Sequence, residues 1–276
     1  MDKIRESFFS GSWYPARREE VVAQIEKWDS ELAPAVSNSF SAIVPHAGWY
    51  FSGLLAFDAI RRLKKNIDVV IIAGGHLPEN YPFLFWSCKS CRTPFGLLDV
   101  QVDIRDVLIG KTDSSFDDSP DNTIELQLPL VHNHFQNIPI VPLRIPAGRQ
   151  AIDFIPVIEE VLEKKKLNAA FIGSTDLTHY GPNYSFTPRE SVANPELWVK
   201  ESDERILKAM IERNGEEILR LANSCRSACS AGAAAAASLW QKSSGAEGGQ
   251  LLKYETSLSR HPSSSFVGYG SVVYPC

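Results

Sequence analysis

Three of the six histidines follow apolar segments that are typical of buried strands. They are His46, His76 and His179, which end the segments Ser41–His46, Val69–His76 and Ala169–His179. In an open parallel sheet the carboxyl ends of the strands face one crevice, and ligands bind there. Histidine is the commonest metal ligand and the usual acid or base near neutral pH. The spacing therefore predicts that several imidazoles point at a common site.

The residues around the first two histidines fit this prediction. Ala47 and Gly48 leave the turn after His46 uncrowded, so that a ligand could approach its ring. His76 follows two glycines, which indicates a turn with unusual dihedral angles or a close approach of the backbone. A histidine that caps the next helix and a histidine on a solvated turn are the alternative interpretations of the two positions.

The third histidine has a carboxylate nearby in the sequence. Asp176 and His179 are three residues apart, which places them on one face of a helical turn. An Asp–His pair orients the imidazole and raises its basicity, as in metal sites and in general-base catalysis. A polar capping turn is the alternative. The remaining histidines carry weaker signals, and we expect surface positions for His132 and His134 and no specific role for His261.

A third metal ligand is less obvious than the two histidines. Mononuclear iron(II) oxygenases add a carboxylate to two histidines, and no carboxylate stands out here. Cys225 precedes an alanine-rich segment, and the N-terminus of a helix there would favour a thiolate. Two histidines and a thiolate suit iron, copper or zinc. Cys229, one helical turn further on, is a rival, and a small buried residue at a helix start is the alternative for Cys225.

The other cysteine motif is the single CxxC formed by Cys88 and Cys91. A structural zinc site normally needs a second such pair. We therefore interpret the motif as two free thiols near a strand end, with metal binding or redox activity as the less favoured alternative.

Composition excludes several classes of protein. Hydrophobic residues make up 44% of the 276 residues, which is enough for a substantial core and argues against disorder. The formal net charge of −5 does not fit nucleic-acid binding, which usually needs a basic surface. The sequence shows no signal peptide and no apolar run long enough to span a membrane. An odd count of five cysteines without a secretory signal predicts reduced thiols and a cytoplasmic protein.

Apolar periodicity predicts alternating strands and helices. The expected strands are Phe40–Val44, Ile67–Ala73, Phe83–Trp86, Ile138–Ile145, Ala169–Gly173, Tyr254–Leu258 and Phe266–Val273. The expected helices are Arg17–Leu32, Phe51–Leu63, Asp103–Ile109, Asn122–Phe135, Ala151–Lys165, Pro195–Glu212, Gly215–Ala222 and Ser227–Gln241, with Asn122 and Glu125 as a capping pair. This order predicts one domain over residues 1–276 with an α/β fold, a three-layer α/β/α sandwich around a mainly parallel or mixed central sheet.

Six short motifs, in order, resemble those of the Memo-like protein family, also called AmmeMemoRadiSam system protein B. The motifs are Gly11–Tyr14, Val44–Gly48, Gly74–His76, Arg92–Pro94, Thr123–Pro129 and Ser174–His179. The resemblance covers nearly the whole chain. Memo-like proteins are in turn similar to the class III extradiol dioxygenases, which are α/β sandwiches with non-haem iron.

The resemblance implies roles for individual residues. His46 and His76 would be the imidazole ligands of a metal, and Cys225 would take the position of the dioxygenase glutamate. His179 would be the acid/base histidine, with Asp176 beside it. Trp13 would line the substrate pocket.

The sequence departs from the family pattern at three places. The family commonly has Glu-His-Ser where this chain has Asp121–Thr123, and Pro-Ser-His where it has Gly74–His76. Glycine and proline usually follow the family's cysteine, whereas Arg226–Ser230 follows Cys225 here, which keeps Cys229 open as the site thiol.

These observations lead to three functional hypotheses. The first is an oxidoreductase in which iron(II), or else copper or zinc, acts with oxygen on a catecholic or other small molecule. The second is a protein on a dioxygenase scaffold that binds a metal, a small molecule or a peptide without turnover. The resemblance also implies radical-SAM pathway proteins as partners. The third and weakest is a zinc-dependent hydrolase.

Overall fold

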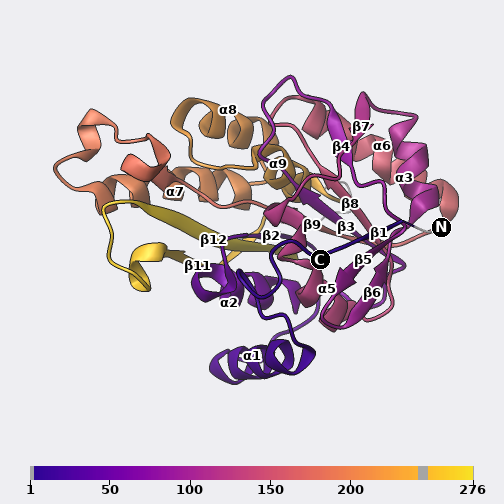
Figure 1. Ribbon diagram of the computed structural model, residues 1–276. Coiled ribbons are helices and arrows are strands. Elements are labelled where there is room, and N and C mark those ends of the chain that lie inside the picture. The colour runs from indigo at the N-terminus through magenta and orange to yellow at the C-terminus, as the bar shows by residue number, and fades with distance from the viewer. Residues whose placement is uncertain (1–2, 242–247, 276) are drawn as a thin grey trace.

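The main sheet places parallel strands at its centre. In the computed structural model, which describes residues 3–241 and 248–275, this sheet has nine strands in the order β10-β12-β2-β9-β3-β8-β4-β7, with β11 paired to β12 (Figure 1). The central strands β2 (Ser39–Val44), β9 (Ala169–Ser174), β3 (Val69–Gly74) and β8 (Ile140–Arg144) are parallel. Continuous apolar runs form these strands because helices cover both faces of the sheet. The predicted central strands are therefore present, whereas the strand predicted over Tyr254–Leu258 ends at Thr256 and a 3₁₀ turn follows it.

Antiparallel pairs at both ends make the sheet mixed, as expected. Strand β12 runs antiparallel to β2, and β4 runs antiparallel to β8. The outer strands are β10 (His179–Tyr180), β11 (Gln250–Thr256), β12 (Phe266–Pro275), β4 (Phe83–Phe85) and β7 (Ser114–Phe116). A separate small sheet contains β1 (Ile4–Arg5), β5 (Ser90–Thr93) and β6 (Gly96–Asp99). Its strands are too short to give a periodic apolar signal, and the sequence did not predict them.

Helices cover the two faces of the main sheet in separate layers. Alternate residues of β3 show this division, since Val70 and Ile72 belong to one apolar core and Val69 and Ile71 to the other. The first core also contains residues of α1 (Arg18–Glu31), α2 (Trp49–Ile60), α4 (Asn122–Glu125) and α5 (Leu128–Phe135). The second contains residues of α3 (Val102–Ile109), α6 (Gln150–Lys165), α7 (Pro195–Ile211), α8 (Gly215–Cys225) and α9 (Ala231–Leu239). The fold is the predicted three-layer α/β/α sandwich.

The helix predicted over Asn122–Phe135 is interrupted. It forms two helices, α4 and α5, with Pro129 in the first turn of α5. Proline lacks the amide hydrogen and clashes with the carbonyl four residues earlier, which here belongs to Glu125, so α4 ends at that residue. The predicted capping pair was also wrong. Asp121 caps α4 by accepting a hydrogen bond from the Thr123 amide.

Small residues bring helix α9 close to the sheet. A Cβ atom on Gly173 of β9 would lie 2.4 Å from the carbonyl oxygen of Ala233 and 2.6 Å from the Cβ of Ala237. Only glycine on the strand, opposite alanines on the helix, allows this approach. The N-terminus of α9 consequently lies beside the ends of the central strands. The helix begins at Ala231, four residues later than the sequence predicted.

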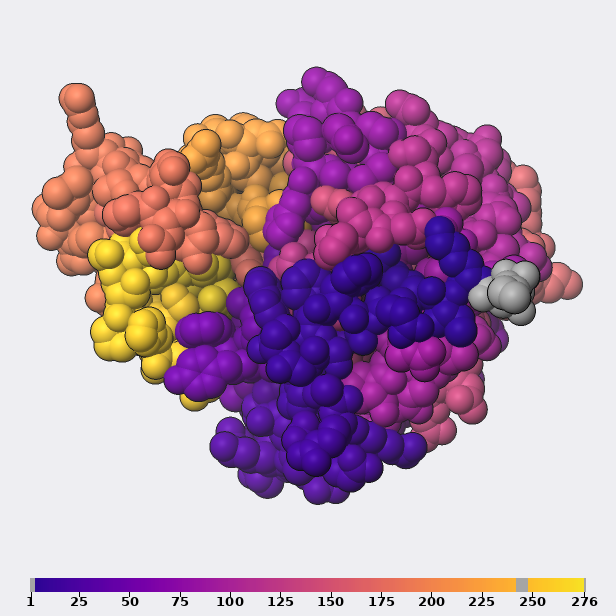
Figure 2. Space-filling view, viewed as in Figure 1, coloured from indigo at the N-terminus to yellow at the C-terminus, as the bar shows by residue number. Residues whose placement is uncertain are grey.

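The N-terminal segment runs over the surface of the folded chain. Figure 2 shows it in indigo, crossing one face of the molecule between later parts of the chain. Among the described residues, no helix combines the length and the apolarity that a membrane crossing requires.

Candidate metal centre

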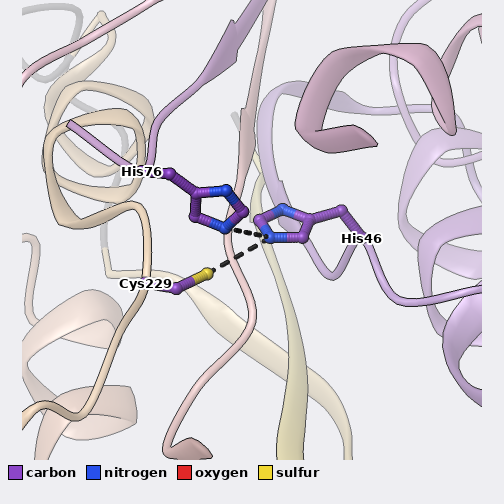
Figure 3. A group of neighbouring side chains, drawn as sticks. All are labelled: His46, His76 and Cys229. Carbon is purple, nitrogen blue, oxygen red and sulfur yellow. Dashed lines mark hydrogen bonds between the residues drawn. The ribbon is translucent and has the colours of Figure 1, made fainter. Parts of the chain in front are cut away.

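Two imidazole nitrogens and one sulfur converge at the carboxyl edge of the central strands. Nε2 of His46 lies 3.2 Å from Nε2 of His76 and 3.2 Å from Sγ of Cys229. All three donor atoms lie within 4.8 Å of one another. Figure 3 shows the His76 ring and the Cys229 sulfur pointing toward the His46 ring from different segments. The predicted convergence of His46 and His76 is therefore present.

The strand order explains this convergence. His46 comes two residues after β2, and His76 two residues after β3. Both strands flank β9 and run parallel to it, so their carboxyl ends lie at one edge of the sheet. His76 itself has a left-handed backbone with φ of 59°, which histidine adopts more readily than most residues. The preceding Gly75 allows a close approach, since a Cβ there would lie 2.5 Å from that of Ser230.

Hydrogen bonds fix the orientation of the His46 ring. Its Nδ1 lies 3.0 Å from Oγ of Ser174, and that oxygen also accepts a hydrogen bond from Nε2 of Gln127. We assign the ring proton to Nδ1, donating to Ser174, which leaves the lone pair on Nε2. Metal-bound histidines are held in the same way, with the second ring nitrogen bonded to a fixed acceptor.

Asp176 ties the His46 turn to the cysteine. Its Oδ1 accepts a hydrogen bond of 2.7 Å from the His46 amide, and its own amide donates to Sγ of Cys229. The Cys229 amide in turn donates to the Asp176 carbonyl. Burial raises the pKa of Asp176 to about 6, although the nearby His179 opposes this shift. Asp176 therefore contacts both the His46 turn and Cys229.

Burial shifts the ligand pKa values toward the neutral forms. Desolvation lowers the pKa of His46 to about 3, so its ring is neutral and able to bind a cation. His76 is exposed as a whole residue, but its ring is partly shielded from solvent. Desolvation is the largest cause that lowers the pKa of this ring, and the charges of His46, His179 and Arg144 lower it further. Burial raises the pKa of the Cys229 thiol to about 12, and the Asp176 charge adds to this shift. A bound cation would supply the positive charge that a thiolate needs in this place.

The two separations from Nε2 of His46 fit a small transition-metal ion. Typical zinc–nitrogen and zinc–sulfur bond lengths place tetrahedral donors about 3.3 Å apart for two nitrogens and about 3.6 Å apart for nitrogen and sulfur. The two observed separations of 3.2 Å differ from these values by a few tenths of an ångström. The donor set of two neutral imidazoles and a thiol suits iron, copper or zinc.

A cavity of about 490 Å³ opens beside the two histidines. Trp13, 41% exposed, lines it, as do Asn122 and Tyr269. His179 lines it too, with its ring edge-on to that of Tyr184 at 4.9 Å. The volume lies within the usual range for small-molecule sites.

The His179 ring is oriented by a different group from the one expected. Its Nδ1 donates to the Leu177 carbonyl at 3.0 Å, whereas the Asp176 carboxylate bonds to the His46 amide. The predicted helical turn is also absent, since Asp176 lies in a loop between β9 and β10. The lone pair of the His179 ring is therefore on Nε2.

The structure brings Cys229, rather than Cys225, to the histidines. Cys225 is the last residue of α8, so it lies at the C-terminal end of a helix and not just before one. Cys225 is half-buried against the apolar core, and its sulfur lies 3.4 Å from Oγ of Ser224. The position just before a helix belongs instead to Cys229, which lies two residues before α9, but burial there outweighs any effect of the helix and keeps the thiol protonated.

The remaining histidines lie elsewhere, and two of them differ from expectation. His132 and His134 are half-buried instead of exposed. Nδ1 of His132 lies 2.8 Å from Oγ1 of Thr93, and Nε2 of His134 lies 2.9 Å from the Leu63 carbonyl oxygen. His261 is exposed.

Sequence reasoning missed the polar residues that support the site. Gln127, between α4 and α5, donates to the Pro45 carbonyl and to Ser174. Glu125 is buried and accepts hydrogen bonds from the Phe8 and Phe9 amides and from the Tyr14 hydroxyl. Glu125 thereby anchors the segment that carries Trp13. Both residues are polar and interrupt an otherwise apolar helical pattern, and this interruption could have identified them from the sequence.

The fold and the site define an α/β protein with a His-His-Cys cluster at the carboxyl edge of its parallel strands. The sequence pattern of Memo-like proteins matches residues 5–273, and the chain belongs to this family. The architecture is consistent with the relation of that family to the extradiol dioxygenases.

Relatives from several organisms match the chain. A MEMO1 family protein from Thermococcus onnurineus is 28% identical over 290 residues, covering 98% of this chain and 99% of the relative. A MEMO1 family protein from Methanosarcina barkeri is 27% identical over 280 residues, with the same coverage. A memo-1 homolog from Caenorhabditis elegans is 26% identical over 198 residues, covering 68% of this chain and 56% of the relative.

Proposed function

We propose that this chain is a metal-dependent oxidoreductase of the non-haem type that acts on a small molecule. Nε2 of His46, Nε2 of His76 and Sγ of Cys229 would hold the ion, with iron(II) the first candidate and copper or zinc the alternatives. The observation that carries the proposal is the meeting of these three donors, within 4.8 Å, beside a cavity of about 490 Å³. When bound, the ion would supply a Lewis acid and, as iron or copper, a redox centre.

The chain's own residues would bind the substrate and move a proton. Trp13, Tyr184 and Tyr269 give the cavity flat apolar walls that suit a ring or a planar group. Nε2 of His179 is free to accept or donate a proton, because Nδ1 is committed to the Leu177 carbonyl. The amide of Asn122, which lines the cavity and also donates to the His46 carbonyl, provides a polar contact.

Metal analysis of matched cysteine variants tests the ligand assignment. We expect wild-type protein purified without oxygen to bind one equivalent of iron(II), copper(I) or zinc. Removal of a residue that only supports a metal ligand lowers metal affinity about 10–100-fold, and Cys229→Ser should lower it by more than that. Cys225→Ser is the matched control and should bind as wild type does. Equal retention of metal by the two variants would remove Cys229 from the site.

Activity is tested separately from metal binding. Iron-loaded wild-type protein should consume oxygen with catechols faster than the same concentration of free iron. His179→Ala should retain the metal and lose most of this activity. Full metal binding without oxygen uptake would contradict the oxidoreductase and favour a protein that binds its ligand without turnover.

A further inference from the structure

A second pair of thiols lies in the small sheet, away from the metal centre. Cys91 belongs to β5, and Cys88 lies in the segment that leads into it. Both residues are fully buried, and their sulfur atoms are 3.7 Å apart. A disulfide has a sulfur–sulfur distance of about 2.05 Å, so bond formation requires an approach of less than about 2 Å. The pair is therefore close to disulfide geometry without being bonded.

A buried arginine faces this pair. Arg5 is the direct neighbour of Cys91 in the parallel pairing of β1 with β5. Its guanidinium lies 3.8 Å from the centre of the Trp86 ring, and Nη2 donates to the Ser119 carbonyl. In the described part of the chain, Nε and Nη1 of Arg5 are buried without a hydrogen-bond partner. Arg5 thus brings a positive charge close to the thiols, and the same charge also acts on the carboxyl groups of Asp121 and Glu125.

This charge differentiates the two cysteines and disfavours a metal. The contact with Cys91 and the charge of Arg5 lower the pKa of the Cys88 thiol against the effect of burial, whereas the same contact and burial raise the pKa of Cys91. Cys88 is therefore the thiol that more readily loses its proton. A cation would be repelled by the guanidinium and would find two thiols where structural zinc sites have four ligands.

We propose that Cys88 and Cys91 form a reversible redox pair that reacts with hydrogen peroxide or another small hydroperoxide. The Cys88 thiol loses its proton, the thiolate sulfur attacks the peroxide and the O–O bond breaks. The leaving hydroxide takes up that proton, so the products are a sulfenic acid and water. Cys91 then attacks that sulfur and releases a second water molecule. In total, two thiols and one hydrogen peroxide give one disulfide and two water molecules. Burial of both sulfurs restricts the oxidant to a small molecule and makes local opening of this sheet part of the reaction.

Differential alkylation of the full chain tests the proposal. Metal-free protein, kept with a chelator, is treated with hydrogen peroxide and denatured. Free thiols are blocked with one reagent, disulfides are reduced, and the released thiols are labelled with a second reagent. Peptide mass spectrometry should find the second label on both Cys88 and Cys91, and dithiothreitol added before blocking should abolish it. The control Cys225→Ala should behave as wild type does.

Two single variants test the order of the steps. Cys91→Ala should leave Cys88 as a sulfenic acid that dimedone traps, whereas Cys88→Ala should leave Cys91 largely unreacted. The proposal would be overturned if both cysteines of peroxide-treated wild-type protein carried the first label, which marks free thiols. An irreversible sulfinic acid at Cys88 would overturn it as well. The labelling pattern of the wild-type protein tests the proposal even if a variant does not fold. Because the protein is free of metal, the result is independent of the function proposed for the metal centre.

Discussion

Nε2 of His46 lies 3.2 Å from Nε2 of His76, although 30 residues separate the two histidines in the chain. The two rings meet nearly edge to face, at an interplanar angle of 83°. Strands β2 and β3 are not neighbours but lie on either side of β9, so the loop after β9 contributes Asp176 to the same edge, and β10, which follows that loop, begins there with His179. One strand order therefore positions both imidazoles of the candidate metal site and the histidine proposed to transfer a proton.

Removal of the Ser174 hydroxyl should weaken metal binding. In Ser174→Ala the Nδ1 hydrogen of His46 loses its acceptor, so the ring tautomer and orientation are no longer fixed. Metal affinity should fall about 10–100-fold, as measured by competition with a chelator. Ser41→Ala is the control, because it removes another buried hydroxyl bond, to the Ala237 carbonyl, from β2. Unchanged affinity in Ser174→Ala would contradict the tautomer assignment.

A methyl group on Gly75 should separate the His76 turn from α9. The new Cβ would lie 2.5 Å from the Cβ of Ser230, next to Cys229 in the sequence. Gly75→Ala should lower the free energy of unfolding by about 1–3 kcal/mol and reduce metal affinity. Gly110→Ala, whose Cβ would be 3.5 Å or more from its nearest neighbours, should stay within about 1 kcal/mol of wild type in urea unfolding. Equal stability of the two variants would show that the close approach is not needed.

Glu125→Gln should loosen the segment that carries Trp13. The glutamine can keep an acceptor oxygen at the Oε1 position, which accepts from Phe8, Phe9 and Tyr14, but its NH₂ group then replaces Oε2 and faces the Phe8 amide. We expect a loss of about 1–3 kcal/mol in stability and faster hydrogen exchange at the Phe8 and Phe9 amides.

An exposed glutamate provides the control for that experiment. Glu160→Gln removes a surface ion pair with Lys164 and should leave the exchange of the Phe8 and Phe9 amides unchanged. Slow exchange at these amides in Glu125→Gln would mean that other contacts hold the N-terminal segment.

Asp203 should make stability fall as the pH rises from about 4 to 7. It is fully buried in α7, where its oxygens accept hydrogen bonds from the Thr178 amide and the Tyr254 hydroxyl. Burial raises its pKa from 3.8 to about 7. The folded chain thus keeps a proton that the unfolded chain has released, and this favours unfolding by up to roughly 4 kcal/mol at the upper end of the range.

The comparison with Asp203→Asn isolates this contribution. As the pH rises through this range, the free energy of unfolding of the variant should increase relative to that of wild type. Urea unfolding at several pH values measures this difference. A difference independent of pH would mean that Asp203 ionises normally.

The sequence by itself determined the layers of the fold and the two imidazole positions. Continuous apolar runs such as Val69–Gly74 indicate strands that are buried on both faces, and parallel strands bring their carboxyl ends together. Histidines placed just after two such strands are therefore predictable neighbours. The six motifs similarly sufficed to indicate the family that the comparison confirmed.

Only the tertiary structure decided which cysteine joins the histidines. Cys225 and Cys229 both precede the alanine-rich segment, so the sequence left both as candidates for the thiol of the site. In the structure α8 continues to Cys225 and α9 starts only at Ala231, and the loop between these helices carries Cys229 to the histidines. Likewise, Asp176 bonds to His46 and Glu125 bonds to Phe8, each more than 100 residues away along the chain. Local periodicity reports which face of an element is buried, whereas such contacts depend on how distant elements pack, and that is fixed only when the whole chain has folded.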